Sequence, residues 1–96
     1  MKDKIDKMNH TPGPWKVFNN GHHWNNGSIV NFEIQFGKDG ECVVDHVYAE
    51  ADAYLIAAAP DLLSDLIEAE AHFRSVGVML LADKYAKTIS KAKGQA

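Results

Sequence analysis

The chain is poor in the residues that mark several large classes of protein. Its 96 residues include a single cysteine, Cys42, so no disulfide can form within the chain and a disulfide-stabilised secreted scaffold is excluded. No segment approaches the run of about 18 apolar residues that a membrane-spanning helix needs. The first residues carry charge with no apolar stretch behind them, which is not the pattern of a signal peptide. We therefore expect a cytoplasmic protein with no membrane partner.

The chain also lacks an excess of basic residues. Ten Lys and Arg residues face thirteen Asp and Glu residues, which gives a net charge of -3 and a pI near 5.9. A nucleic-acid-binding domain normally has a basic face or a pI above about 9, so we expect no direct nucleic-acid partner. The acidic residues are spread along the chain, which also argues against a dense acidic mimic of DNA.

The first half of the chain has the pattern of an antiparallel sheet. Residues 1–9 are predicted to be a flexible leader, and residues 10–93 a single α+β domain. The clearest strand runs from residue 29 to residue 36, where Phe32, Ile34 and Phe36 alternate with polar residues. A first strand is expected from Trp15 to Phe18, a loop or short strand at 22–27, and a returning strand at 41–48 after a turn at 37–40. One face of this sheet is buried and the other is solvated.

The second half of the chain favours helices, because alanine, leucine and glutamate dominate from residue 50 onward. A short helix is expected at 52–59. Pro60 fits the first turn of a helix and so opens a second helix after a corner. Helices at 61–74 and 78–91, separated by Gly77, form an αα-hairpin, and 94–96 are a frayed tail.

Strands followed by helices define the predicted fold class as α+β. It has an N-terminal antiparallel β-meander of three to four strands, then two to three α-helices with a Pro60 corner and a C-terminal αα-hairpin. Ile56, Met79 and Leu80 fall outside the main apolar stripes of the helices. We therefore expect uncovered apolar surface and a partner to shield it, most simply a second copy in a homo-oligomer, with a dimer as the simplest form.

Two segments of the chain resemble a known group of proteins. They are His-Thr-Pro-Gly-Pro-Trp at 10–15 and Ala-Asp-Ala-Tyr-Leu-Ile-Ala-Ala-Ala-Pro-Asp-Leu-Leu at 51–63. In this order they resemble a widespread group of small accessory proteins encoded by tailed phages and prophages. The resemblance implies a phage-encoded protein in the cytoplasm of an infected bacterium, and it supplies no catalytic residues. Small phage proteins outside the virion often inhibit or sequester host factors, so it also implies a role of that kind.

The histidines of the 19–27 loop are the only candidate metal ligands of note. His22 and His23, with His46 and Asp45 on a nearby strand, could in principle bind zinc. The chain has no cysteine pair and no helical His-x-x-x-His, which zinc sites commonly use. Adjacent histidines in a strand also point to opposite faces. We expect a polar loop here, with no metal and no cofactor.

The sequence contains no recognisable catalytic arrangement. Cys42 lies between Glu41 and Val43, without the basic neighbours or the oriented base that activate a thiol. No nucleophile–base pair and no phosphate-binding glycine loop is apparent. We therefore expect that the protein is not an enzyme.

Aromatic residues are the remaining candidates for contact with a ligand. The aromatic residues are Trp15, Trp24, Phe32, Phe36, Tyr48 and Tyr54. Most of them are expected to form the core. Alternatively, they could line a pocket in which His10, His22 and Asn25 supply the polar groups. Trp24 is the exception, because it lies among Asn, Gly and His residues, and tryptophan is enriched at binding hot spots. The predicted binding surface joins the 19–27 loop to the solvated face of the sheet. Its residues are Trp24, His22, His23, Asn25, Asn31, Glu33 and Gln35.

Two functions are compatible with these observations. The first is a non-enzymatic accessory protein that binds a host protein or a small ligand and inhibits or sequesters a component of bacterial antiviral defence. The alternative is a homo-oligomeric structural or assembly module without a dedicated ligand site. In the alternative, the apolar helices associate and the sheet caps them.

Overall fold

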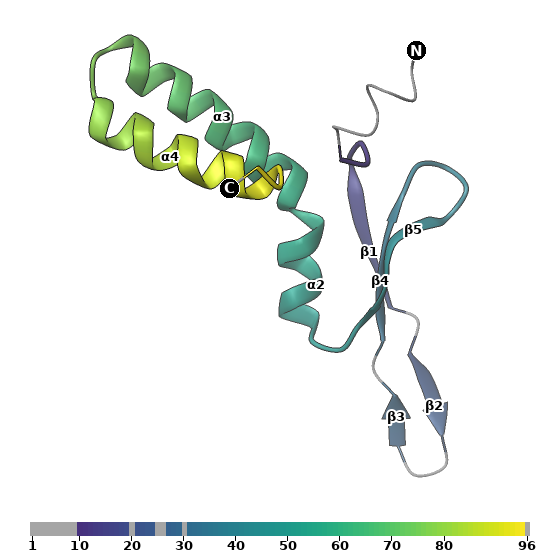
Figure 1. Cartoon of the computed structure of the whole chain (residues 1–96). Helices are drawn as coiled ribbons and strands as arrows, with labels where there is room; N and C mark the ends of the chain where they lie inside the picture. The colour runs from purple at the N-terminus through teal and green to yellow at the C-terminus, as the bar shows by residue number, and fades with distance from the viewer. Residues whose placement is uncertain (1–9, 20, 25–26, 30, 96) are drawn as a thin grey trace. The chain divides into compact units, whose positions relative to one another are not determined.

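The computed structural model describes residues 10–19, 21–24, 27–29 and 31–95, with the backbone alone at 22–24 and 27–29. Contacts divide the chain into two compact units, which meet between Pro60 and Asp61 in sequence. Residues 11–60 form a sheet unit and the residues from 61 onward form a helical unit (Figure 1). Whether residues 10–93 form a single domain depends on how these two units associate. The single domain therefore stays a prediction.

The sheet unit contains a three-stranded antiparallel sheet with the order β1-β4-β5. Its strands are β1 (Trp15–Asn19), β4 (Phe32–Phe36) and β5 (Glu41–Val47). A two-stranded hairpin of β2 (His22–Trp24) and β3 (Gly27–Ile29) lies between β1 and β4 in sequence. The expected α+β fold with an N-terminal meander is confirmed, and the short strand near residue 22 forms. The single strand expected from 29 to 36 is wrong, because β3 ends at Ile29 and β4 begins at Phe32.

The turn between β4 and β5 has a glycine at each end. Gly37 has φ +70° and Gly40 has φ +73°, the left-handed region that other residues adopt at a cost. Asp39, between them, has negative φ, since no described residue other than glycine has positive φ. The predicted turn is therefore present, and its two glycines supply the positive φ angles.

The core of the sheet unit forms where α2 (Glu50–Ala57) contacts one face of the sheet. Phe32, Ile34 and Val47 are buried there, and Ile34 is fully buried. Ala53 of α2 is also fully buried, because its small side chain lets the helix approach the strands closely. Ile56 packs against this cluster. The expectation that Ile56 belongs to an uncovered apolar surface is therefore wrong.

The helix break expected near Pro60 is confirmed. α2 ends at Ala57 and α3 begins at Ala59, so Pro60 lies in the first turn of α3 (Ala59–Ser75). There its missing N–H costs no helical hydrogen bond. Gly13 lies against this proline: a Cβ added to Gly13 would be 3.5 Å from Pro60 Cβ. The two sequence blocks that carry the phage resemblance therefore touch each other in the sheet unit.

The helical unit contains the expected αα-hairpin of α3 and α4 (Met79–Ala92) (Figure 1). α3 closes with a Schellman motif, in which Val78 N–H donates to Phe73 O at 2.8 Å and Gly77 N–H donates to Arg74 O at 3.3 Å. Gly77 has φ +85°, as its predicted position after the helix requires. Gly94 and Gln95 close α4 with the same pair of bonds, to Lys91 O and Ser90 O.

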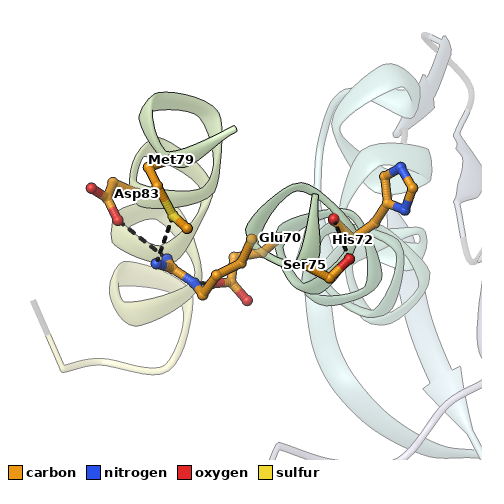
Figure 2. A network of polar contacts seen from close by, with 6 residues as sticks. Glu70, His72, Ser75, Met79 and Asp83 are labelled. Carbon is orange, nitrogen blue, oxygen red and sulfur yellow. Dashed lines mark hydrogen bonds and ion pairs between the residues drawn. The ribbon is translucent and has the colours of Figure 1, made fainter. Parts of the chain in front are cut away.

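A contact between aromatic rings and an ion pair join the two helices of the hairpin. The rings of Phe73 and Tyr85 lie 5.9 Å apart between centroids. Arg74 donates to Glu70 Oε2 at 2.6 Å on its own helix and to Asp83 Oδ1 at 3.2 Å on α4 (Figure 2). These hydrogen bonds raise the pKa of the guanidinium further above its already high ordinary value. Arg74 is the only arginine of the chain, and it anchors the end of α3 to the start of α4.

Several large apolar side chains in the helical unit stay exposed. Met79 is 48% exposed and Leu80 is 88% exposed, as the sequence predicts, and Val76 beside them is 58% exposed. Among the described residues, no helix has the length and apolar character needed to cross a membrane.

Candidate binding surface

The face of the sheet turned away from α2 carries polar side chains around one exposed aromatic ring. The register places Lys16 and Phe18 of β1 opposite Gln35 and Glu33 of β4. Because side chains alternate along a strand, these four residues lie on the face opposite to Ile34 and the core. Phe18 is 43% exposed, so an aromatic side chain stands partly uncovered among charged and amide groups. We call these four residues, with Cys42, the open face.

A hollow of about 370 Å³ borders Phe18 on this face. It lies between the first half of β1 and the β4–β5 turn. Its lining residues are Pro14, Lys16, Phe18, Gln35, Phe36, Gly37, Lys38 and Gly40. Two lysines and the Gln35 amide therefore border this hollow together with the exposed ring of Phe18.

Hydrogen bonds order the centre of the open face. Gln35 Nε2 donates to Glu33 Oε1 at 2.8 Å, so these two predicted surface residues are positioned together. Cys42 lies on β5 opposite Gln35. Partial desolvation, the hydrogen bond with Glu33 and the negative charges of Glu33 and Asp45 raise the pKa of its thiol. The thiol therefore stays protonated near neutral pH, whereas a reactive cysteine needs a lowered pKa.

Asn31 makes a different contact from Glu33 and Gln35. It precedes β4, and its Oδ1 lies 2.8 Å from His46 Nδ1. The His46 ring in turn stacks on Tyr48, with centroids 6.3 Å apart and an interplanar angle of 19°. Asn31 therefore contacts His46 near the end of β5 through its side chain. The sequence alone does not predict this contact.

The structure describes the backbone alone for the predicted contacts in the β2–β3 hairpin. His22 pairs with Ile29, His23 with Ser28 and Trp24 with Gly27. Asn25 lies outside the described residues. The role of Trp24 as a contact residue therefore stays a prediction. Among the side chains that the structure describes, no group of three or more His, Cys, Asp and Glu residues could hold a metal ion.

The expected core role of the aromatic residues is right for some and wrong for others. Phe32 is buried, and Trp15 packs against the core while its Nε1 donates to Thr11 O at 3.1 Å. Tyr48 and Tyr54 are 74% and 59% exposed, so the core prediction is wrong for both. Phe18 was not among the predicted contact residues, although strand alternation, which places Trp15 and Val17 on the buried face, would have assigned it to the other face.

The fold and this surface define a small α+β protein with a three-stranded antiparallel sheet, an exposed sheet face and a helical hairpin. A family model described as Salmonella phage P22 protein Y8K6 matches residues 1–96, and the chain belongs to this family. It is therefore a small phage protein, as the resemblance implied. That the blocks at 10–15 and 51–63 are the signature of the group stays a prediction. Neither the curated proteins nor the solved structures contain a match to the chain.

Proposed function

We propose that this phage protein is a non-enzymatic accessory protein that binds a host protein through the open face of its sheet. By that binding it would inhibit or sequester a component of bacterial antiviral defence in the cytoplasm of the infected cell. Membership of a phage protein family supports the setting. The open face supports the mode of action.

The observation that carries the proposal is the position of Phe18. Protein interfaces typically place an aromatic anchor at the centre of a patch with a polar rim. Phe18 is 43% exposed, and Lys16, Glu33 and Gln35 surround it on the same face. The geometry therefore offers an apolar anchor together with groups that can orient a partner by hydrogen bonds and charge.

The position of the hollow, rather than its size, supports a protein partner. Its volume of about 370 Å³ lies within the about 300–1,000 Å³ range of ligand pockets. It is bordered by a sheet face and a turn, which suits the insertion of one side chain from a partner. The raised pKa of the Cys42 thiol supports a binding role for this face over nucleophilic catalysis.

The test compares capture of host proteins by three forms of the chain. The wild type, a Phe18→Ala variant and a matched control, Tyr54→Ala, are used as baits in lysate of the bacterial host. Tyr54 is an exposed aromatic residue on α2 of the same unit, so its removal matches the loss of exposed ring without touching the open face. Any host protein that the wild type retains is then purified, and its affinity for each form is measured by calorimetry.

We expect the affinity for the host protein to fall roughly tenfold or more in the Phe18→Ala variant, which is the scale of a hot-spot loss. The affinity of the Tyr54→Ala variant is expected to be unchanged. Equal binding by Phe18→Ala, or no host protein retained by the wild type, would contradict the proposal. A Trp24→Ala variant in the same series tests whether the 19–27 loop adds to the surface. Plating of phage carrying the Phe18→Ala gene on hosts with and without a defence system tests the anti-defence role.

The alternative function is a homo-oligomeric structural or assembly module. The exposed apolar residues at the α3–α4 connection favour it, because monomers rarely leave such residues uncovered together. An assembly module would keep its role in the Phe18→Ala variant. It would lose that role when the helical hairpin is altered.

A further inference from the structure

The two helices of the hairpin carry opposite charge. α3 has four carboxylates and one arginine, whereas α4 has three lysines and one carboxylate. The charges that dominate each helix are largely exposed. They are Asp61, Asp65 and Glu68 on α3 and Lys84, Lys87 and Lys91 on α4.

The lysines of α4 share one face of their helix. Lys84, Lys87 and Lys91 are spaced three and four residues apart, which aligns them along the helix. Ala82 and Tyr85, on a different face, are buried and half-buried, and Tyr85 contacts α3 through Phe73. The lysines therefore lie on a face turned away from α3.

The exposed carboxylates of α3 also share one face of their helix. Asp61, Asp65 and Glu68 are spaced four and three residues apart and are all exposed. Leu66 and Phe73, which are half-buried, lie on another face of α3. Each helix thus presents its dominant charge away from its neighbour in the same chain.

The ion pair between α3 and α4 joins two residues whose charge is opposite to the prevailing charge of their own helix. Arg74 of the acidic α3 pairs with Asp83 of the basic α4 at 3.2 Å (Figure 2). Among the residues that the structure describes, the three lysines of α4 take part in no salt bridge. The dominant charges of the hairpin are therefore left for contacts with another molecule.

The hairpin also has little core of its own. No residue of α3 is buried and Ala82 is the single buried residue of α4, while Leu62 and Ile67 are 52% and 40% exposed. The fraction of surface that folding buries falls as a unit becomes smaller, so a small unit with few buried residues is marginally stable by itself. Beside the lysines, α4 also borders an open hollow of about 640 Å³ lined in part by Lys87 and Lys91.

We propose that two copies of the chain associate through this hairpin, with α3 of one copy lying antiparallel to α4 of the other in a four-helix bundle. The second copy covers the apolar residues and brings acidic α3 beside basic α4. A two-fold axis along the bundle makes every such contact occur twice. The surface is self-complementary in charge, which points to a second copy of this chain as the occupant.

The positions of the charged residues along the helix axes agree with a pairing of acidic α3 with basic α4 of the second copy. We call the position of a residue along the axis its height. Phe73 lies beside Tyr85 and Arg74 beside Asp83, and each further residue advances about 1.5 Å along its helix. Counting from these contacts, Lys87 is within about one turn of the height of Glu68, and Lys91 within one turn of Asp65. An axis along the bundle keeps these heights in the partner, so Glu68 and Asp65 are expected to pair with the partner's lysines.

The test measures the dissociation constant of the dimer by analytical ultracentrifugation. The double variant Lys87→Glu with Lys91→Glu turns the attractive pairs into repulsive ones at both symmetry-related sites. We expect it to raise the dissociation constant roughly tenfold or more. The matched control, Lys16→Glu with Lys38→Glu, makes the same change in net charge in the sheet unit. These lysines border the surface proposed to bind a host protein, so the control is measured only with the purified chain, where the dissociation constant of the dimer is expected to be unchanged.

A charge swap separates loss of pairing from loss of folding. The double variant Asp65→Lys with Glu68→Lys makes both helices basic, whereas the first double variant makes both acidic. Each alone is expected to dimerise poorly, and an equal mixture of the two is expected to form a heterodimer close to wild-type affinity. Recovery in the mixture also shows that both variants are folded, which far-UV circular dichroism of each checks independently.

Several outcomes would overturn the proposal. One is a wild-type chain that stays monomeric at 100 micromolar, roughly the upper range of weak dimers. Another is a dimer that the charge changes on α3 and α4 do not weaken, or whose two variants fail to recover on mixing. If the wild type is monomeric and the lysine variant instead loses binding to an acidic partner, the basic face of α4 serves that partner and not a second copy.

Discussion

At the scale of single residues, the centre of the open face is controlled by Glu33. Its carboxylate accepts a hydrogen bond from Gln35 and lies beside the Cys42 thiol, where it disfavours the thiolate. A thiolate, not a thiol, reacts with alkylating reagents. Partial desolvation of the thiol and, next to it, Glu33 raise the pKa of Cys42, so we expect Glu33 to slow modification of this exposed cysteine.

This protection can be measured by alkylation of Cys42 with iodoacetamide at pH 8. Because the charge and hydrogen bond of Glu33 raise the pKa of the thiol, Glu33→Gln is expected to lower that pKa and speed the reaction. Asp39→Asn, which removes an exposed carboxylate from the turn, is the control and is expected to leave the rate unchanged. An equal rate for wild type and Glu33→Gln would show that Glu33 does not govern the thiol.

At the scale of elements, glycines and one proline decide where helices begin and end. Pro60 lies in the first turn of α3, which begins at Ala59, and Gly77 closes that helix with a Schellman motif. Gly94 closes α4 in the same way. A Cβ added at Gly77 or Gly94 would meet nothing within 4 Å, so a substitution there acts through the backbone angle alone.

Gly77→Ala is therefore expected to destabilise the hairpin by about 1 kcal/mol, the cost of holding an alanine at positive φ. Thermal unfolding followed by circular dichroism at 222 nm measures this change. Gly94→Ala is the matched control, because its φ of +74° is similar but it caps the last helix near the end of the chain. We expect a smaller loss there, since only the final turn of α4 depends on it. Equal losses at both sites would contradict the view that Gly77 fixes the hairpin.

At the scale of the whole molecule, stability comes from two unequal sources. The sheet unit has a core around the fully buried Ile34 and Ala53, whereas the hairpin has a single buried residue, Ala82. Burial of apolar surface is the main stabilising contribution in small domains. We therefore expect the helical unit to gain more stability from the proposed dimer than the sheet unit does.

Association makes thermal stability depend on concentration. If the hairpin dimerises, a hundredfold increase in protein concentration is expected to raise the midpoint of thermal unfolding by about 5 °C or more. The Lys87→Glu and Lys91→Glu double variant is expected to show a smaller rise over the same concentrations. A wild-type midpoint that does not change with concentration would contradict dimerisation.

Much of the fold could be predicted from local patterns in the sequence. The alternation of Phe32, Ile34 and Phe36 indicated β4, and Pro60 and Gly77 indicated the limits of α3, because these signals depend on neighbouring residues alone. The same patterns gave Glu33 and Gln35 as residues of the solvated sheet face, and the structure places them together there. The separation of β3 from β4 was not predicted, because one run of β-forming residues includes both strands and therefore indicated a single strand.

The sequence by itself determined the order of strands and helices, because backbone propensity, turn residues and apolar periodicity act over a few residues. Tertiary structure decided which apolar side chains were covered: Ile56 packs on the sheet, whereas Tyr48 and Tyr54 stay exposed. It also brought Asn31 to His46 and Arg74 to Asp83. These outcomes depend on strand register and helix packing, which bring together residues that are distant in sequence, and no local pattern encodes such distances.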